Sequence, residues 1–357
     1  MDPSLLIPKA IPIPVEWGWF YLFQVLTFIA HMLVMNVMLG VSVIAFVHHL
    51  RGKAETHPLT FDIAQKLPFT IAIAVNFGVA PLLFLQVLYG QFLYTSSVLM
   101  AVFWLLVVAL VIVAYGSAYY YDFQYKSLGA MRTFFIGLTA LCLLCVAFIF
   151  TNNMTLMLSP DHWTRYFTNP SGTLLNLNDP MVLPRYLHIV VSAIALGGLF
   201  IAIVWYRKRE KNPEAAQKWI RYGTAWFAYP SMLQYAMGMW FLTAMPPRVS
   251  ALILGGSMMH TLVFALGAIT GIYSIATALQ QRIKVTTFLA VLTIILMVLL
   301  RDMVRSAYLA PYFAMSNREV LGDYTPLVLF VITLVAGLAM IAWMLKTASE
   351  VNKEVRS

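Results

Sequence analysis

The sequence predicts an all-α membrane protein, a polytopic bundle of about nine transmembrane helices with its N-terminus outside the cell and its C-terminus inside. Of its 357 residues, 61% are hydrophobic and only 10% are charged, and the mean hydropathy is +0.81. Charged residues make up about a quarter of a typical soluble domain. Gly and Pro contents are ordinary and only two Cys are present, so fibrous, disulfide-rich and disordered classes are also excluded.

The stretches that lack Asp, Glu, Lys and Arg divide the chain into candidate spans, because a spanning helix needs about 20 apolar residues. These stretches are residues 17–50, 67–121, 133–160, 186–206, 222–247, 249–281, 285–300 and 324–345. The second is too long for one helix, and Tyr94, Thr95 and Ser96 offer a polar turn in its middle. We therefore expect one membrane domain over residues 1–357, with helices over about 18–49, 68–93, 97–121, 132–155, 184–206, 219–244, 250–280, 285–308 and 325–346.

The basic residues give the orientation, because loops on the cytoplasmic side are enriched in Lys and Arg. Most of the 23 Lys and Arg residues follow the first, third, fifth and seventh predicted helices or the last one. The net charge of +9 is thus a sign of topology, and we expect no nucleic-acid partner. The largest outer connection, about 155–183, contains two Pro turns and is expected to be an ordered loop.

Polar side chains at membrane depth are costly, so each is a candidate site. Three of the seven histidines lie at membrane depth, namely His31, His188 and His260, whereas His48 and His49 are at the inner end of the first predicted span. A single membrane histidine is often explained by a hydrogen bond to a neighbouring helix. Three membrane histidines on separate helices, in a chain with almost no intramembrane carboxylate, instead favour b-type haem. Haem iron takes His or Met from facing helices, whereas metal-ion transport uses carboxylate or carbonyl ligands.

Other residues in the spans suit the same cofactor. Met259 offers a thioether beside the histidine of the seventh span, although membrane Met residues usually serve packing. Arg185 precedes the fifth-span histidine by one turn, and Arg301 and Arg305 share one helix face with Asp302 between them. These three arginines could bind haem propionates, or they could be interface residues that extend their charged ends to water.

Three segments together resemble subunit I of the cytochrome bd quinol oxidase family. They are LTFIAHMLVMNVMLG in the first span, NFGVAPLLFLQVLYG in the second, and FTNNMTLML followed by a Pro-containing loop and PRYLHIVVSAIALGG in the fifth. The resemblance covers roughly residues 20–205 and extends weakly to the end of the chain. Nine spans with an outer N-terminus fit the same family.

The resemblance implies roles for individual residues. His31 corresponds to the ligand of the high-spin haem near the outer side, and His188 to one axial ligand of the low-spin haem b that accepts electrons from quinol. The second ligand in the family is a Met early in the seventh helix, where Met259 and His260 are the two candidates here. The expected cofactor is haem b, one or more, ahead of haem d.

The sequence also departs from the family in four places. The second span has Gln86 where the oxidases carry acidic residues, and the third span, 97–121, has no carboxylate. No Glu precedes Arg301 in the eighth span, and the long outer quinol-binding loop is replaced by residues 244–250, AMPPRVS. Both the oxygen site and the usual donor site are therefore altered.

These observations predict a bd-like, haem b-binding electron-transfer subunit in a bacterial or archaeal cytoplasmic membrane. The expected partners are the lipid bilayer, a quinone or quinol, and other subunits of a redox complex, among them a c-type cytochrome on the periplasmic side. The protein would then be the electron-transfer subunit of a quinol-dependent oxidoreductase. The alternatives are a divergent bd-type terminal oxidase, and a haem-free transporter or membrane anchor whose histidines only join helices.

Overall fold

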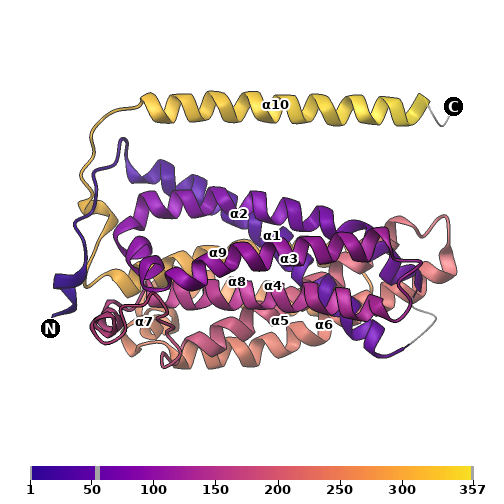
Figure 1. The fold of residues 1–357 in the computed structure, drawn as a ribbon, viewed down its shortest axis with the longest axis horizontal. Helices are drawn as coiled ribbons and strands as arrows, with labels where there is room; N and C mark the ends of the chain where they lie inside the picture. Colours follow the sequence, from indigo (N-terminus) through magenta and orange to yellow (C-terminus); the bar gives the residue numbers. More distant parts are fainter. Residues whose placement is uncertain (1, 53–56, 355–357) are drawn as a thin grey trace.

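The computed structural model describes residues 2–52 and 57–354 and confirms the all-helical prediction (Figure 1). Within these residues the only β-type contact is an isolated bridge between Ile13 and Val320. The helices are α1 Trp17–Leu50, α2 His57–Leu99, α3 Ala101–Phe123, α4 Met131–Leu156, α5 Val182–Arg207, α6 Pro213–Ala244, α7 Pro247–Ala251, α8 Met258–Leu279, α9 Ile283–Leu309 and α10 Thr325–Glu354.

Eight helices of the described chain are long and apolar enough to cross a membrane. The helix that contains the predicted 219–244 span, α6, is not among the eight, although it has 32 residues. Its first turns carry Glu214, Lys218 and Arg221, and its later part contains Gln234. The sequence is therefore less apolar here than in the other long helices, while α6 still packs along α5 inside the bundle.

The prediction of a turn at residues 94–96 is wrong, because α2 continues through these residues to Leu99 and α3 begins at Ala101. The Oγ1 atom of Thr95 donates to the carbonyl of Gln91 at 2.8 Å, and the Oγ atom of Ser96 donates to that of Leu93 at 3.0 Å. Ser and Thr hydroxyls that donate to a backbone carbonyl one turn earlier fit within a continuous helix. The helix is instead interrupted earlier, at Tyr89, whose φ of −131° and ψ of 29° are not helical.

The expected helix 250–280 is also divided. Residues Leu252–Gly256 form a wide π turn in which Gly255 has a φ of +117°. Ser257 then has extended backbone, and α8 starts at Met258. A residue with a side chain rarely adopts the conformation of Gly255, so this glycine allows the chain to change direction before α8.

Small residues bring α1, α5 and α6 into backbone contact. A Cβ atom added to Gly40 would lie 1.9 Å from the carbonyl oxygen of Ala193, and one added to Gly197 would lie 2.5 Å from the carbonyl carbon of Gly40. Gly198 and Gly223 make similar approaches between α5 and α6. Small residues permit such close helix packing in membranes, where burial of apolar surface gives little driving force.

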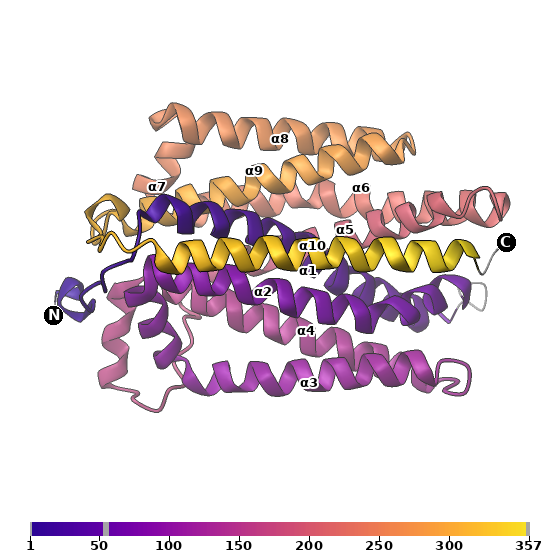
Figure 2. The same ribbon diagram turned by 90° about the horizontal axis from the view of Figure 1, so that it is seen from above.

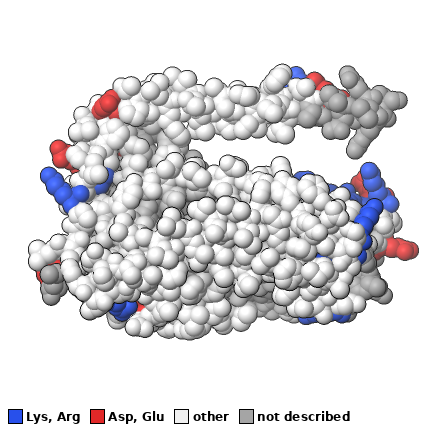
Figure 3. All heavy atoms as spheres, in the orientation of Figure 1, with Lys and Arg blue, Asp and Glu red and all other residues white. Residues whose placement is uncertain are grey.

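The bundle has two distinct ends. One end, here the N-terminal end, carries the N-terminal arm, the α4–α5 connection and the α9–α10 connection (Figures 1 and 2). The other, here the basic end, carries the α1–α2, α3–α4, α5–α6 and α8–α9 connections. On the face drawn in Figure 3, charged side chains lie towards the two ends and a band without them lies between, as expected for a membrane span.

Helix α10 runs alongside the bundle at a distance from it (Figures 1 and 3). It is joined to the bundle at the N-terminal end, where the backbone N–H of Ile13 donates to Glu319 and that of Leu321 donates to Ile13, both at 2.9 Å. The Phe330 ring packs edge-on against the stacked rings of Phe23 and Phe84, with centroid separations of 5.0 and 5.6 Å. These contacts attach α10 near its start.

Candidate functional site

A buried cluster of charged residues occupies the N-terminal end of the bundle. In α9, the Nη2 atom of Arg305 lies 2.8 Å from Oδ1 of Asp302, and Nη1 of Arg301 lies 3.4 Å from the same oxygen. The Asp302 and Arg305 side chains are 2% and 5% exposed. Arg185 of α5 interacts electrostatically with Arg301 and Arg305, so two helices contribute to the cluster.

The charges of this cluster do not balance. The three arginines face one fully buried carboxylate, that of Asp302, and Asp179 adds a second negative charge near Arg185 at the cluster's edge. One oxygen of Asp302, Oδ2, is buried without a hydrogen-bond partner. Because a buried charge is costly unless it is paired, the excess of positive charge indicates a place for an anionic group.

His31 lies on α1 next to this cluster. Its Nδ1 atom is 3.0 Å from the carbonyl oxygen of Ala74 in α2, so this nitrogen carries the proton and the lone pair is on Nε2. The Arg301 guanidinium lies 4.2 Å from the ring centroid of Phe28, one turn before His31. Gly78 of α2 makes room for the imidazole, since a Cβ atom there would lie 2.9 Å from Cε1.

His188 faces α6 one turn after Arg185. Its Nδ1 atom is buried and has no hydrogen-bond partner. Gln234 of α6 donates through Nε2 to the backbone carbonyl of His188 at 2.8 Å, which holds the two helices together at this level. Gly238 of α6 lies beside the ring, since a Cβ atom there would lie 3.6 Å from Cε1, at ordinary van der Waals distance.

His260 and Met259 lie in the first turn of α8. The Nδ1 atom of His260 is 2.8 Å from the Oγ atom of Ser257, and the Met259 side chain is 62% exposed on the outside of the bundle. The described contacts link neither residue to His188. The second axial ligand predicted among these two residues therefore stays a prediction, as do the other ligand assignments.

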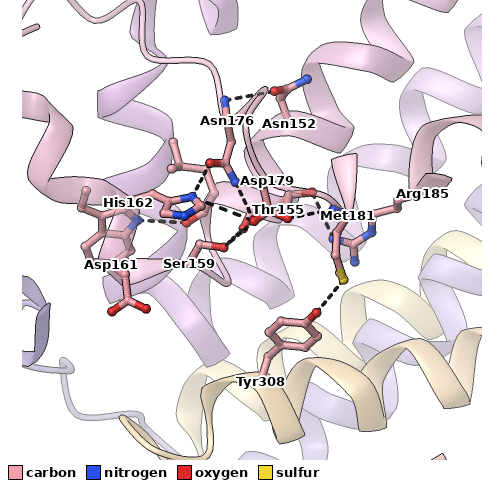
Figure 4. A network of polar contacts seen from close by, with 12 residues as sticks. Asn152, Thr155, Ser159, Asp161, His162, Asn176, Asp179, Met181, Arg185 and Tyr308 are labelled. Carbon is pink, nitrogen blue, oxygen red and sulfur yellow. Dashed lines mark hydrogen bonds and ion pairs between the residues drawn. The ribbon is translucent and has the colours of Figure 1, made fainter. Parts of the chain in front are cut away.

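A polar network that the sequence did not reveal lies in the α4–α5 connection (Figure 4). Asp179 is its centre, and its carboxylate accepts from Ser159 Oγ at 3.0 Å, Asn176 Nδ2 at 3.1 Å and the Met181 backbone at 2.9 Å. Asn176 also lies 2.5 Å from Nδ1 of His162. The Asp-Pro pair at 179–180 was the available signal, but it indicated only a turn.

This network is connected to the arginine cluster through α4 and α5. The Nη1 atom of Arg185 donates to Oγ1 of Thr155 at 3.4 Å, and the Tyr308 hydroxyl contacts Sδ of Met181 (Figure 4). Arg248 donates to the carbonyls of Ala307 at 3.1 Å and Tyr308 at 2.9 Å, which satisfies acceptors at the end of α9. The connection is thus ordered and fixes the start of α5.

A second arginine interaction accompanies the interruption of α2. The Nη2 atom of Arg318, in the α9–α10 connection, donates to the carbonyl of Val87 at 2.8 Å. The Arg305 guanidinium lies 5.3 Å from the Tyr89 ring centroid, and the Tyr89 hydroxyl is 3.3 Å from Ser306 Oγ. The interruption at Tyr89 therefore turns an aromatic side chain towards the charged cluster.

The fold and this cluster define a multi-pass helical membrane protein with an excess of buried positive charge at one end. No family model and no curated protein matches the sequence. Among solved structures, the chain is similar to one from the bd oxidase of Geobacillus thermodenitrificans, with a TM-score of 0.69, 12% sequence identity, and coverage of 97% of this chain and 98% of that chain. The chain has a bd oxidase-like fold over nearly its whole length.

Proposed function

We propose that this protein is a haem b-binding electron-transfer subunit that passes electrons between a membrane quinone pool and a redox partner outside the membrane. The observation that carries the proposal is the buried arginine cluster beside His31, in a fold similar to that of a bd oxidase. A c-type cytochrome in the same complex is the proposed external partner, and a bacterial or archaeal cytoplasmic membrane is the proposed location.

The residues of the chain fit haem chemically. Histidines that bind iron commonly donate their second ring N–H to a carbonyl, as His31 does to Ala74, which leaves Nε2 for the metal. The orphaned Nδ1 atom of His188 shows that no group of the described chain pairs with this side of its ring. Arg185, Arg301 and Arg305 supply the positive charge that propionates need.

When bound, haem would supply reversible one-electron chemistry at its iron. His31 would bind the iron of one haem and His188 the iron of another, with Met259 or His260 as the proposed second ligand near His188. The arginines would hold the propionates and raise the reduction potential, because positive charge stabilises the reduced, less positively charged iron. Asp302 would keep Arg301 and Arg305 oriented and would partly offset this effect.

The buried acids favour electron transfer over the oxidase alternative. Oxygen reduction consumes protons, and acidic side chains within a membrane bundle commonly deliver them. Among the described residues Asp302 is the only fully buried carboxylate, and it is already paired with arginine. A bd-type oxidase that obtains its acids from a second subunit is the second candidate, and the fold similarity is the observation in its favour.

The experiment is to measure haem per polypeptide and the reduced-minus-oxidised spectrum of single alanine variants at His31, His188, His260 and Met259. We expect His31→Ala and His188→Ala each to lose one spectral species, and His188→Ala to remove a low-spin one. His49→Ala, at the basic end, is the control and should keep the full haem content. A wild-type preparation without haem would refute the proposal, and oxygen uptake by the purified complex, whether or not cyanide inhibits it, would favour the oxidase.

A further inference from the structure

The interruption of α2 is supported by a residue from a distant part of the chain. Tyr89 has non-helical dihedral angles although its side chain is buried in the bundle. An interrupted membrane helix needs other donors for its carbonyl groups, because lipid supplies none. Arg318 of the α9–α10 connection, 231 positions after Val87, supplies one through the 2.8 Å hydrogen bond from Nη2 to the Val87 carbonyl.

Aromatic packing fixes the α9–α10 connection beside this interruption. The ring centroid of Phe313 lies 6.0 Å from that of Tyr89 and 5.8 Å from that of Phe92. The Arg318 guanidinium lies 6.0 Å from the centroid of the same Phe313 ring. Arg318 therefore contacts both the interrupted backbone and the aromatic group that packs on Tyr89.

The Tyr89 side chain reaches two consecutive residues of α9. The Arg305 guanidinium lies 5.3 Å from the ring centroid of Tyr89, and the hydroxyl lies 3.3 Å from Oγ of Ser306. A cation is attracted to the face of an aromatic ring, and the attraction is stronger away from water. The Nη2 atom of Arg305 also lies 2.8 Å from Oδ1 of Asp302. The ring and the carboxylate together fix one buried guanidinium.

We infer that Tyr89 is a positioning residue, which orients Arg305 towards a haem propionate, and that Arg318 holds Tyr89 in place. This inference rests on the proposed function, in which the arginines raise the reduction potential of the haem at His31. A positive charge acts on that potential only while it is held close, because electrostatic energy falls with distance. Without the ring, Arg305 would keep its carboxylate partner Asp302 and gain rotamer freedom, so it would offset less propionate charge.

Spectroelectrochemical titration of the haem-loaded full chain tests the role of Tyr89. The haem to follow is the spectral species that His31→Ala removes. We expect Tyr89→Leu to lower its reduction equilibrium constant about tenfold, the scale of a desolvated cation–π contact, which is about 59 mV for one electron. Tyr89→Phe keeps the ring and should stay within about twofold of the wild type. Tyr94→Leu, the same change at an exposed position of α2, is the control and should leave the constant unchanged.

A double variant tests whether Arg318 acts through Tyr89. Arg318→Gln alone should lower the same constant by about two- to threefold, the lower end of the coupling between residues in contact. In the Tyr89→Leu background it should cause no further decrease, because the ring that Arg318 holds is already absent. Lys9→Gln removes an exposed positive charge from the same end of the bundle and should change neither chain.

Deuterium exchange of backbone amides gives a readout that does not depend on redox chemistry. Arg318→Gln should speed exchange in α2 around Tyr89, whereas Lys9→Gln should not. Where Tyr89→Leu does not fold, Arg318→Gln decides by its potential and its exchange.

Three results would overturn the inference and leave the proposed function standing. They are bound haem with an unchanged potential in Tyr89→Leu and Arg318→Gln, shifts from the two substitutions that simply add, and an unchanged exchange rate in Arg318→Gln. A wild-type chain without haem would overturn the proposed function, and this inference with it.

Discussion

Replacing Gly78 by alanine should move the His31 imidazole without disturbing the fold. The added Cβ atom would lie 2.9 Å from Cε1 and 3.1 Å from Nδ1 of His31. Ordinary carbon contacts lie at about 3.5 Å or more, so the ring must shift by about 0.5 Å. The obstacle is the end of a side chain that can rotate, so the stability cost should stay at or below the roughly 1–3 kcal/mol of overpacking.

The consequence for the site should be larger than the consequence for stability. The shift competes with the 3.0 Å hydrogen bond between Nδ1 and the Ala74 carbonyl, which fixes the ring orientation. Loss of such an outer hydrogen bond typically costs about 10–100-fold in metal affinity. We therefore expect Gly78→Ala to lower haem content or to change the high-spin signal in electron paramagnetic resonance.

The control is Gly116→Ala in α3, where an added Cβ atom meets nothing within 4 Å. Both variants gain the same helix propensity, about 1 kcal/mol, so the difference between them isolates the contact with His31. An unchanged spectrum and full haem content in Gly78→Ala would refute the placement of His31 as an iron ligand supported by α2.

Three further predictions concern packing and charge. Gly40→Ala places a Cβ atom 1.9 Å from a backbone oxygen of α5, so the helices must separate, and we expect a loss of about 2–4 kcal/mol in detergent unfolding, against no loss for Gly116→Ala. Asp302→Asn leaves its arginines unpaired and should cost about 3–5 kcal/mol in thermal unfolding without haem; an unchanged midpoint would contradict the buried pair. The Tyr324 hydroxyl donates to Glu16 and holds the pKa of that exposed carboxyl below its ordinary value. Because the pKa of Glu16 is lower in the folded protein than in the unfolded one, the hydrogen bond stabilises the fold above the unfolded pKa, and this contribution disappears as the pH falls through the folded pKa. We therefore expect tryptophan fluorescence near Glu16 to change at acidic pH in the wild type and not in Tyr324→Phe.

The approximate places of the long helices could be read from charge distribution alone, because a membrane span needs an apolar stretch of fixed length. Their number as spans could not, since eight helices of the described chain, and not nine, are long and apolar enough to cross a membrane. Where the helices break was harder to predict from local residue types. Thr95 and Ser96 looked like a turn, but their hydroxyls are satisfied by carbonyls one turn back. The break near Gly255 was likewise missed, since two adjacent glycines within an apolar run do not specify which of them takes a positive φ.

The candidate site was predictable as a set of residues but not as an arrangement. Intramembrane histidines and arginines stand out because each is costly in lipid. Their neighbours are set by helix rotation and crossing, which bring Ala74 and Gly78 against His31 and leave Met259 on the outside of the bundle. The role of Asp179 in ordering the α4–α5 connection depends on contacts across 20 residues of chain.

The amino-acid sequence by itself determined that this protein is a helical bundle in lipid, because composition and charge spacing decide which segments can leave water. Only the tertiary structure decided which charges meet. It packs α9 against α1 and α5, so that Arg301 and Arg305 share the buried carboxylate of Asp302 near Arg185, and it joins Lys66 of α2 and Lys208 of the α5–α6 connection around Asp62. The physical reason is that each segment's own composition decides whether it can leave water. Electrostatic pairing depends instead on the distances between segments, and these are set only when the helices pack together.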